Sequence, residues 1–162
     1  MASEAVLNDH DAFEQAVRAE SRALYGLAVS ILRNSPEAED AVQQTMELAW
    51  RSWNTLRDPT RRTAWLKTIC VRQCFGIRRR RFGLLPLSDN ERDERPSTAS
   101  DPDLDRAYSQ LSLRQRAVIR LHYRDGYTLD ECAALMGCRP GTARSQLNRG
   151  LKKLRQELSN DE

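Results

Sequence analysis

The stretch that decides the fold is residues 127–155, YTLDECAALMGCRPGTARSQLNRGLKKLR. Thr128, followed three residues later by Glu131, forms a capping box that predicts the start of a short helix. Gly137 offers the turn that ends this helix, and Pro140 suits the first turn of the next. The second helix has apolar side chains at helical spacing: Ala143, Leu147, Leu151, Leu154 and Leu158. This order of elements predicts a helix-turn-helix.

The face of the second helix opposite its apolar stripe carries hydrogen-bonding side chains. They are Arg139, Thr142, Arg144, Ser145, Gln146, Asn148 and Arg149. Arg, Gln and Asn pair bidentately with guanine or adenine edges in the major groove, whereas a merely solvated helix more often carries Glu and Lys. By spacing alone an ordinary helical hairpin remains the alternative, but the side chains favour the reading of duplex DNA.

Helical periodicity also dominates the rest of the sequence, without sustained two-residue alternation. Apolar spacing predicts helices over about 11–33, 35–53 and 58–81. Ser35 is the expected N-cap of the second of these, with Pro36 at its first position. We therefore expect an all-α fold.

A polar, acidic stretch at 86–101, which contains Pro96, predicts a flexible linker because it cannot bury enough apolar surface. It separates two small helical domains, at 10–85 and 102–158. In the second domain a helix over about 113–124 is expected before the helix-turn-helix.

The 162 residues carry a net charge of +3, and the charges alternate along the chain. Residues 1–56 hold 4 basic and 9 acidic side chains, whereas 57–85 hold 9 basic and 1 acidic. Residues 86–110 are again acidic, and 111–162 are basic. Most of the basic residues are Arg, which favours forked contacts with phosphates and base edges. Two separated basic surfaces suggest a polyanion that is contacted in two places.

The first basic block places aromatic side chains beside the arginines at 78–81. Basic groups next to flat rings suit single-stranded or distorted DNA, whose unstacked bases need a π surface. The alternative is that the tryptophans are core and that the arginines end a solvated helix. We expect Trp50 and Trp65 to lie in the core and the Arg run to contact phosphate.

Other classes of function find little support in the sequence. No apolar run could span a bilayer and no signal peptide is recognised, so a soluble, cytoplasmic protein with reduced cysteines is expected. His10 and His122 are far apart, and Cys70 and Cys74 have no third metal ligand nearby. Cys132 and Cys138 are expected to be packing residues. There is no phosphate-binding glycine loop or nucleophile elbow, so we expect no enzyme, no catalytic residue, no metal and no cofactor.

Three motifs carry a family resemblance. PEAEDAVQQTM at 36–46 resembles region 2.2 of extracytoplasmic-function (ECF) sigma factors of the sigma-70 family, and WLKTI at 65–69 with the following Arg run resembles region 2.4. LSLRQR at 111–116, together with the helix-turn-helix, resembles region 4. The motifs occur in the family's order, with no region 1 or 3, and cover about residues 11–158.

This resemblance implies a dissociable subunit of bacterial RNA polymerase that directs promoter-specific initiation. The residues matching the family's dock on the β′ clamp helices are Glu39, Asp40, Gln43 and Gln44. The loop before Trp65 and the helix after it match the part that captures minus-10 bases, which implies Asn54, Arg57, Arg61, Arg62, Trp65, Arg72, Arg78, Arg79 and Arg80. Region 4 would bind the β flap and read minus-35 DNA with the polar face 139–149. Family behaviour also suggests an anti-sigma factor as a partner.

Four positions depart from the family pattern. Arg72 stands where Asn is common, Gly76 where Asp is common, Gln146 where Arg is common and Ala143 where Val is common. Arg72 follows Trp65 by two helical turns and can only donate hydrogen bonds. We expect it to favour a base with paired acceptors, guanine before thymine, or to grip a phosphate, and we expect an unusual promoter sequence.

Two rival classes remain: a polymerase-independent repressor, and a module that sequesters another regulator. A duplex-binding repressor needs neither the acidic helix at 37–47 nor a surface for single strands. A sequestering module has no reason to present Arg and Asn at groove-reading spacing.

Overall fold

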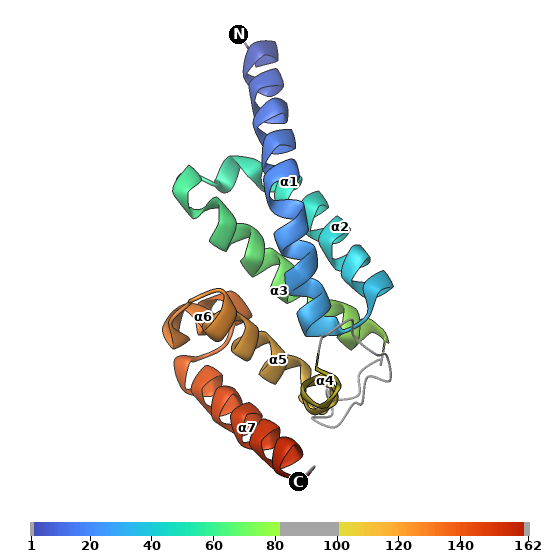
Figure 1. Cartoon of the computed structure of the whole chain (residues 1–162). Helices are drawn as coiled ribbons and strands as arrows, with labels where there is room; N and C mark the ends of the chain where they lie inside the picture. The colour runs from blue at the N-terminus through green and yellow to red at the C-terminus, as the bar shows by residue number, and fades with distance from the viewer. Residues whose placement is uncertain (1, 82–100, 161–162) are drawn as a thin grey trace.

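A computed structural model describes residues 2–81 and 101–160, and the described residues form helices and no strands. Figure 1 shows two groups of helices packed on each other, which we call the N-terminal half and the C-terminal half. The N-terminal half contains α1 (Ala2–Leu32), α2 (Ser35–Arg51), the short 3-10 turns η1 (Trp53–Thr55) and η2 (Pro59–Arg61), and α3 (Arg62–Arg81). The C-terminal half contains α4 (Pro102–Ser109), α5 (Leu113–Ile119), η3 (Arg120–Arg124), α6 (Leu129–Met136) and α7 (Pro140–Ser159). The predicted all-α fold is confirmed.

The N-terminal half is a three-helix unit in which α1, α2 and α3 pack against one another. Arg33 adopts a left-handed conformation with φ 53°, which ends α1 and allows a sharp turn into α2. The N-cap of α2 is Asn34 rather than the predicted Ser35, because the Asn34 side-chain oxygen accepts a hydrogen bond from Glu37 N at 3.0 Å. Pro36 lies in the first turn of α2, as predicted.

The segment between α2 and α3 differs from the prediction. The helix expected to run to residue 53 ends at Arg51, and two 3-10 turns follow it. Asp58 caps η2 by accepting a hydrogen bond from Thr60 N at 3.0 Å. The chain between Ser52 and α3 is therefore an ordered loop of short turns rather than the end of a long helix.

The C-terminal half has the predicted helix-turn-helix. Thr128 and Glu131 form the capping box of α6, and Gly137 ends α6 with φ 69°. The helix expected over 113–124 changes at Arg120 into the π-helical segment η3, in which Asp125 N donates to Arg120 O at 3.2 Å.

The two halves share an extensive interface, formed where α3 packs on α6 and α1 on α5. One cluster of buried apolar side chains includes residues of both halves. Arg116 on α5 is 1% exposed, and its Nε donates to Ile31 O at 2.8 Å. This bond satisfies a carbonyl in the last turn of α1, which has no partner within its own helix.

The predicted flexible linker at 86–101 lies almost wholly outside the described residues. Within residues 2–81 and 101–160, no helix has the length and apolar character that a membrane crossing requires.

Candidate nucleic-acid interface

Helix α7 presents the polar face predicted from the sequence. Arg144, Asn148 and Arg149 are exposed, whereas Ala143 and Leu147 are buried against the rest of the C-terminal half. Arg139 and Thr142 are also exposed, and Ser145 and Gln146 are partly buried. Figure 1 shows α7 on the side of α5 and α6 that faces away from α3. An exposed helix bearing these donors and acceptors has the shape and chemistry to enter a major groove.

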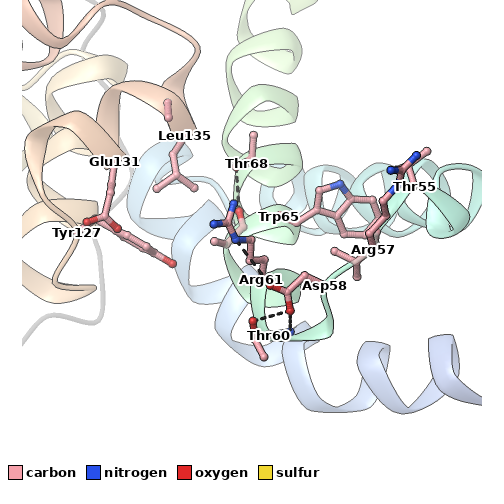
Figure 2. A pocket seen from close by; sticks show the side chains of 13 residues that line it. Thr55, Arg57, Asp58, Thr60, Arg61, Trp65, Thr68, Tyr127, Glu131 and Leu135 are labelled. Carbon is pink, nitrogen blue, oxygen red and sulfur yellow. Dashed lines mark hydrogen bonds and ion pairs between the residues drawn. The ribbon is translucent and has the colours of Figure 1, made fainter.

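The loop before α3 borders a cavity of about 840 Å³. From the N-terminal half, Figure 2 shows Arg61, Trp65 and Thr68 around it, together with the loop residues Asp58 and Thr60. Trp65 is half-buried and Arg61 is exposed, so a flat ring and a cation lie near one another at the surface. The Thr60 hydroxyl and backbone N–H both donate to Asp58 and lower the pKa of its carboxyl group, with a smaller contribution from Arg61.

The opposite wall of this cavity belongs to the C-terminal half. Figure 2 shows Tyr127, Glu131 and Leu135 facing the loop, and Ala134 also lines the cavity. The cavity therefore lies between the two halves. The sequence predicts only the wall formed by the N-terminal half. The second wall depends on how the two halves pack against each other, which no local sequence pattern indicates.

Of the other residues predicted near this loop, Asn54 and Arg57 are exposed and Arg62 is half-buried. Arg72 lies farther along α3, where its Nη2 donates to Ala134 O at 3.4 Å. Its guanidinium also lies beside Gly137, at the end of α6.

The four arginines at the end of α3 do not share one role. Arg79 and Arg80 are exposed, and Arg80 donates to the side-chain oxygen of Gln44 at 2.9 Å. The Arg78 side chain is 7% exposed, and its Nε lies 3.1 Å from Glu37 Oε2. Arg78 also donates to Leu32 O, so this arginine joins all three helices of the N-terminal half. The expectation that Arg78 contacts phosphate is therefore corrected to a packing role.

Helix α2 separates its side chains into two faces. Glu39, Asp40 and Gln43 are exposed and Gln44 is partly buried. The opposite face, with Ala38, Ala41, Thr45 and Ala49, is buried. The predicted dock residues thus form one continuous polar and acidic face on the surface.

An aromatic cluster joins α1 to the loop. Phe13 contacts both Trp50 and Trp53, with ring centroids 5.0 and 5.2 Å apart, and Trp53 lies 6.2 Å from Trp65. Trp50 is 42% exposed, so its predicted place in the core is wrong. It lies at the end of α2, where its ring contacts His10 and Phe13 of α1 and otherwise remains open to solvent.

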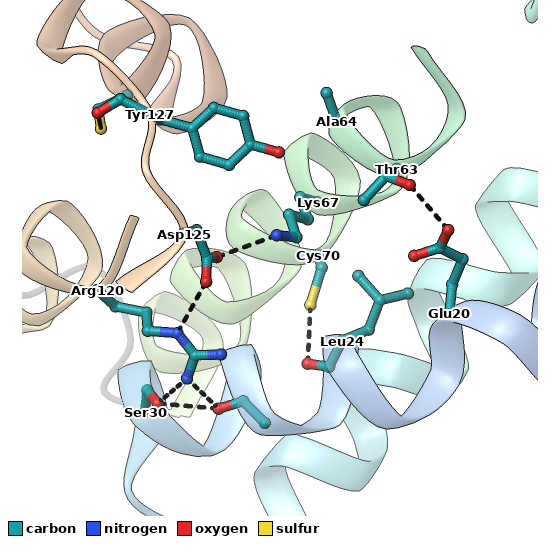
Figure 3. Close-up of polar contacts among 12 residues, drawn as sticks. Glu20, Leu24, Ser30, Thr63, Ala64, Lys67, Cys70, Arg120, Asp125 and Tyr127 are labelled. Atoms are coloured by element: carbon teal, nitrogen blue, oxygen red, sulfur yellow. Dashed lines mark hydrogen bonds and ion pairs between the residues drawn. The ribbon is translucent and has the colours of Figure 1, made fainter. Parts of the chain in front are cut away.

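A charged network that sequence reasoning missed crosses the interface between the halves (Figure 3). Lys67 Nζ lies 3.1 Å from Asp125 Oδ2, and Arg120 Nε lies 3.3 Å from Asp125 Oδ1. Arg120 also donates to Gly26 O at 3.0 Å and to the Ser30 hydroxyl. Except for the local Arg120–Asp125 pair, the residues that these contacts join are separated by 58 to 94 positions in the sequence. A local sequence pattern therefore cannot predict them.

The cysteines are reduced within the described residues, as expected. Cys70 is buried, and its Sγ donates to Leu24 O at 3.7 Å. Burial, with Glu131 nearby, raises the pKa of the Cys132 thiol to about 11, as befits a packing residue. One exposed group of possible metal ligands, His10, Asp11 and Glu14, occurs on α1, but exposed acidic groups are common without an ion.

The fold and these surfaces define a two-part helical nucleic-acid-binding protein with a helix-turn-helix at its C-terminal end. The family profile described as Sigma-70 region 2 matches residues 16–81, and the one described as Sigma-70, region 4 matches residues 102–154. The chain belongs to the sigma-70 family, and its resemblance to the ECF group is confirmed.

Two relatives illustrate how far the similarity extends. The RNA polymerase sigma factor CarQ of Myxococcus xanthus is 31% identical over 156 residues, which cover 91% of this chain and 90% of that protein. The ECF RNA polymerase sigma factor SigM of Mycobacterium tuberculosis is 31% identical over 155 residues, which cover 92% and 78% respectively.

Two solved structures have a similar fold. The sigma factor RpoE in complex with the anti-sigma factor NepR, from Bartonella quintana, gives a TM-score of 0.70 at 27% identity and covers 93% of this chain and 98% of that one. CnrH in complex with the cytosolic domain of CnrY gives a TM-score of 0.68 at 24% identity and covers 99% and 96%, which supports the fold.

Proposed function

We propose that this chain is a sigma factor that binds core RNA polymerase and directs transcription initiation at its own set of promoters. The observation that carries this function is the presence of both sigma regions, in order, on one chain whose α7 presents base-reading side chains to solvent. A sigma factor acts by binding, so we propose a cytoplasmic protein with no catalytic residues and no cofactor.

The polymerase dock is the exposed face of α2. Glu39, Asp40, Gln43 and Gln44 lie along it, and an acidic helix complements a basic coiled coil such as the β′ clamp helices. The buried face of α2 holds the three-helix unit together, so Glu39, Asp40 and Gln43 are available without unfolding, whereas Gln44 already accepts a hydrogen bond from Arg80.

The minus-35 surface is the polar face of α7 with the residue that precedes it. Arg144, Asn148 and Arg149 are exposed along the first half of the helix, where a recognition helix meets base edges. Arg139, Thr142, Ser145 and Gln146 complete the proposed set. The β flap is proposed as the site at which this domain rests on polymerase.

The minus-10 surface is the loop and the following face of α3. It comprises Asn54, Arg57, Arg61, Arg62, Trp65, Arg72, Arg79 and Arg80, and it omits Arg78, which is buried. The cavity beside Trp65 is lined by an aromatic ring, hydroxyl groups and cations, which suits an unstacked base and its phosphate. The proposed domain boundaries remain 10–85, 86–101 and 102–158.

A run-off transcription assay tests the function. Purified core polymerase is incubated with genomic DNA fragments, with and without this protein, and new start sites are mapped. We expect defined starts only when both proteins are present. A gel shift separates the rival classes: a repressor shifts promoter duplex by itself, whereas a sigma factor needs core polymerase for a specific open complex. An anti-sigma partner, as in the complex of the Bartonella quintana protein, is proposed as the regulator.

A further inference from the structure

The helix that carries the base-reading face, α7, rests on α5 at a residue without a side chain. The buried residues of α7 are Ala143, Leu147 and Gly150. They are spaced four and three residues apart, so they lie on one face of the helix. Gly150 directly follows Arg149, which is exposed and which the proposed function assigns to minus-35 DNA. The contact beneath Gly150 therefore helps to determine where the base-reading face lies.

The space beside Gly150 is already filled by side chains of α5. A Cβ atom at this position would lie 3.0 Å from Ile119 Cδ1 and 3.3 Å from Gln115 Cβ. Carbon atoms in good contact lie about 3.5–4.0 Å apart, so a methyl group at residue 150 would be about 0.5 Å too close to α5. Among the glycines that the structure describes, Gly150 has the nearest neighbours.

The side chains of α5 are held in place on their own side of this contact. Gln115 is 5% exposed, and its Oε1 accepts a hydrogen bond from Ser112 N at 3.0 Å, while Gln115 N donates to the Ser112 hydroxyl at 3.2 Å. Its Cβ is bonded directly to the backbone, so no side-chain rotation moves it away from α7. Ile119 is partly buried against the apolar cluster that both halves share. A larger residue at position 150 would therefore displace α7 rather than α5.

A displacement of this size is large for a base-reading contact. Hydrogen bonds from N–H groups to oxygen span only about 2.7–3.2 Å, so a shift of about 0.5 Å takes a bond of average length out of this range. Asn148 has a short side chain that cannot extend to follow the base edge, whereas the longer Arg144 and Arg149 can adjust. Asparagine reads adenine through a bidentate pair, which depends on the position of the helix backbone.

We infer that Gly150 is a positioning residue for minus-35 recognition. Because it has no side chain, α7 packs close to α5, and this close packing places the polar face at the depth and angle at which it meets base edges. Gly150 is buried and contacts no base itself. The inference rests on the proposed function for the assignment of α7 to minus-35 DNA.

The test replaces Gly150 with alanine and measures base preference in the holoenzyme. The promoter identified by run-off transcription is prepared as a set of fragments, each with one base pair changed in the upstream or the minus-10 element. Discrimination at a position is the ratio of the dissociation constants for the changed and the unchanged fragment. We expect Gly150→Ala to lose about tenfold in discrimination at one or more upstream positions, which is what a good bidentate contact supplies. Discrimination at the minus-10 positions should stay at the wild-type value, because the surface assigned to them lies in the N-terminal half.

Two further substitutions separate the contact with α5 from other effects of alanine. Gly26→Ala in α1 is the matched control: alanine favours the helix there as it does at residue 150, but the nearest atom to the new Cβ is 3.8 Å away. Its discrimination should equal that of the wild type. Ile119→Val removes Cδ1, the atom nearest to the new methyl group, and should be silent by itself. Combined with Gly150→Ala, it should restore most of the lost discrimination.

Three results would overturn the inference. One is wild-type discrimination by Gly150→Ala at every upstream position, even with a lower melting temperature, because the contact would then serve stability alone. Another is an equal loss of affinity for all upstream sequences, which indicates lost phosphate contacts rather than displaced base readers. The third is that Ile119→Val restores nothing. Failure of the proposed function has a different signature, since the wild-type protein itself then gives no run-off transcripts.

Discussion

Replacing Arg78 with Met provides a sharp test of how the N-terminal half is held together. Arg78 contacts Glu37 at the start of α2 and the Leu32 carbonyl at the end of α1. Removing one partner of a buried ion pair costs about 3–5 kcal/mol, because the other charge stays buried. Arg81 still pairs with Glu37 in the variant, so we expect the lower end, about 3 kcal/mol.

The loss can be measured by urea unfolding. All three tryptophans lie between Trp50 and Trp65, so intrinsic fluorescence follows the N-terminal half selectively. For a chain of this size, about 3 kcal/mol corresponds to a fall in melting temperature of about 6–12 °C. The double variant Arg78→Met with Glu37→Gln should lose less than the sum of the two single changes, since the residues interact directly.

The matched control is Arg79→Met, one residue along the same run of arginines and exposed to solvent. Its stability should stay within about 0.5 kcal/mol of the wild type. If Arg78→Met proves as stable as Arg79→Met, and instead lowers the salt dependence of single-strand binding by one phosphate contact, then Arg78 serves DNA rather than packing.

Three further predictions follow from exposed and buried positions. Asp40→Lys combined with Gln43→Ala should abolish binding to core polymerase while circular dichroism stays unchanged; undiminished affinity in a titration would rule out α2 as the dock. Arg144→Ala and Arg149→Ala should each weaken holoenzyme binding to the upstream element by about 1–3 kcal/mol if each arginine reads a base. Full sequence discrimination in both variants would exclude α7 as the reader. Burial raises the pKa of Tyr108 to about 12 from 10.0, so the unfolded chain loses this proton first as the pH rises. The contribution of Tyr108 to stability should therefore be constant below about pH 10 and fall by up to about 3 kcal/mol toward pH 12; urea midpoints with the same pH dependence in Tyr108→Phe would contradict this.

The helix-turn-helix could be predicted from sequence because its signals are local. The capping box of Thr128 and Glu131 and the left-handed turn at Gly137 each act within a few residues, and both are present in the structure. Helical spacing also predicts the buried Ala143 and Leu147 of α7, whereas Leu158, at the end of the same predicted buried stripe, is 41% exposed because the last turn of α7 lies at the edge of the C-terminal half. Local rules also located the start of α2, although Asn34 rather than Ser35 caps it.

The role of Arg78 could not be read from composition. Successive residues of a helix point about 100° apart, so four consecutive arginines cannot all face one ligand. One of them had to turn toward the protein, and the identity of that residue depends on how α3 packs against α1 and α2. Arg116, Arg120 and Asp125 escaped notice for a similar reason, since most of their partners lie in the other half of the chain.

Because η3 is a π-helical turn, the number of residues in this segment determines the direction of the helices that follow it, whichever side chains it carries. The bond from Asp125 N to Arg120 O spans five residues, one more than an α-helical turn. Deleting one residue there would restore ordinary pitch and rotate all that follows by about 100°. The Asp125 carboxylate would then lose its contact with the Lys67 ammonium, and α6 and α7 would rotate together as a rigid body. A substitution within η3 keeps the number of residues and therefore the orientation of the following helices. A deletion of one residue would instead change the orientation of α7 relative to the N-terminal half.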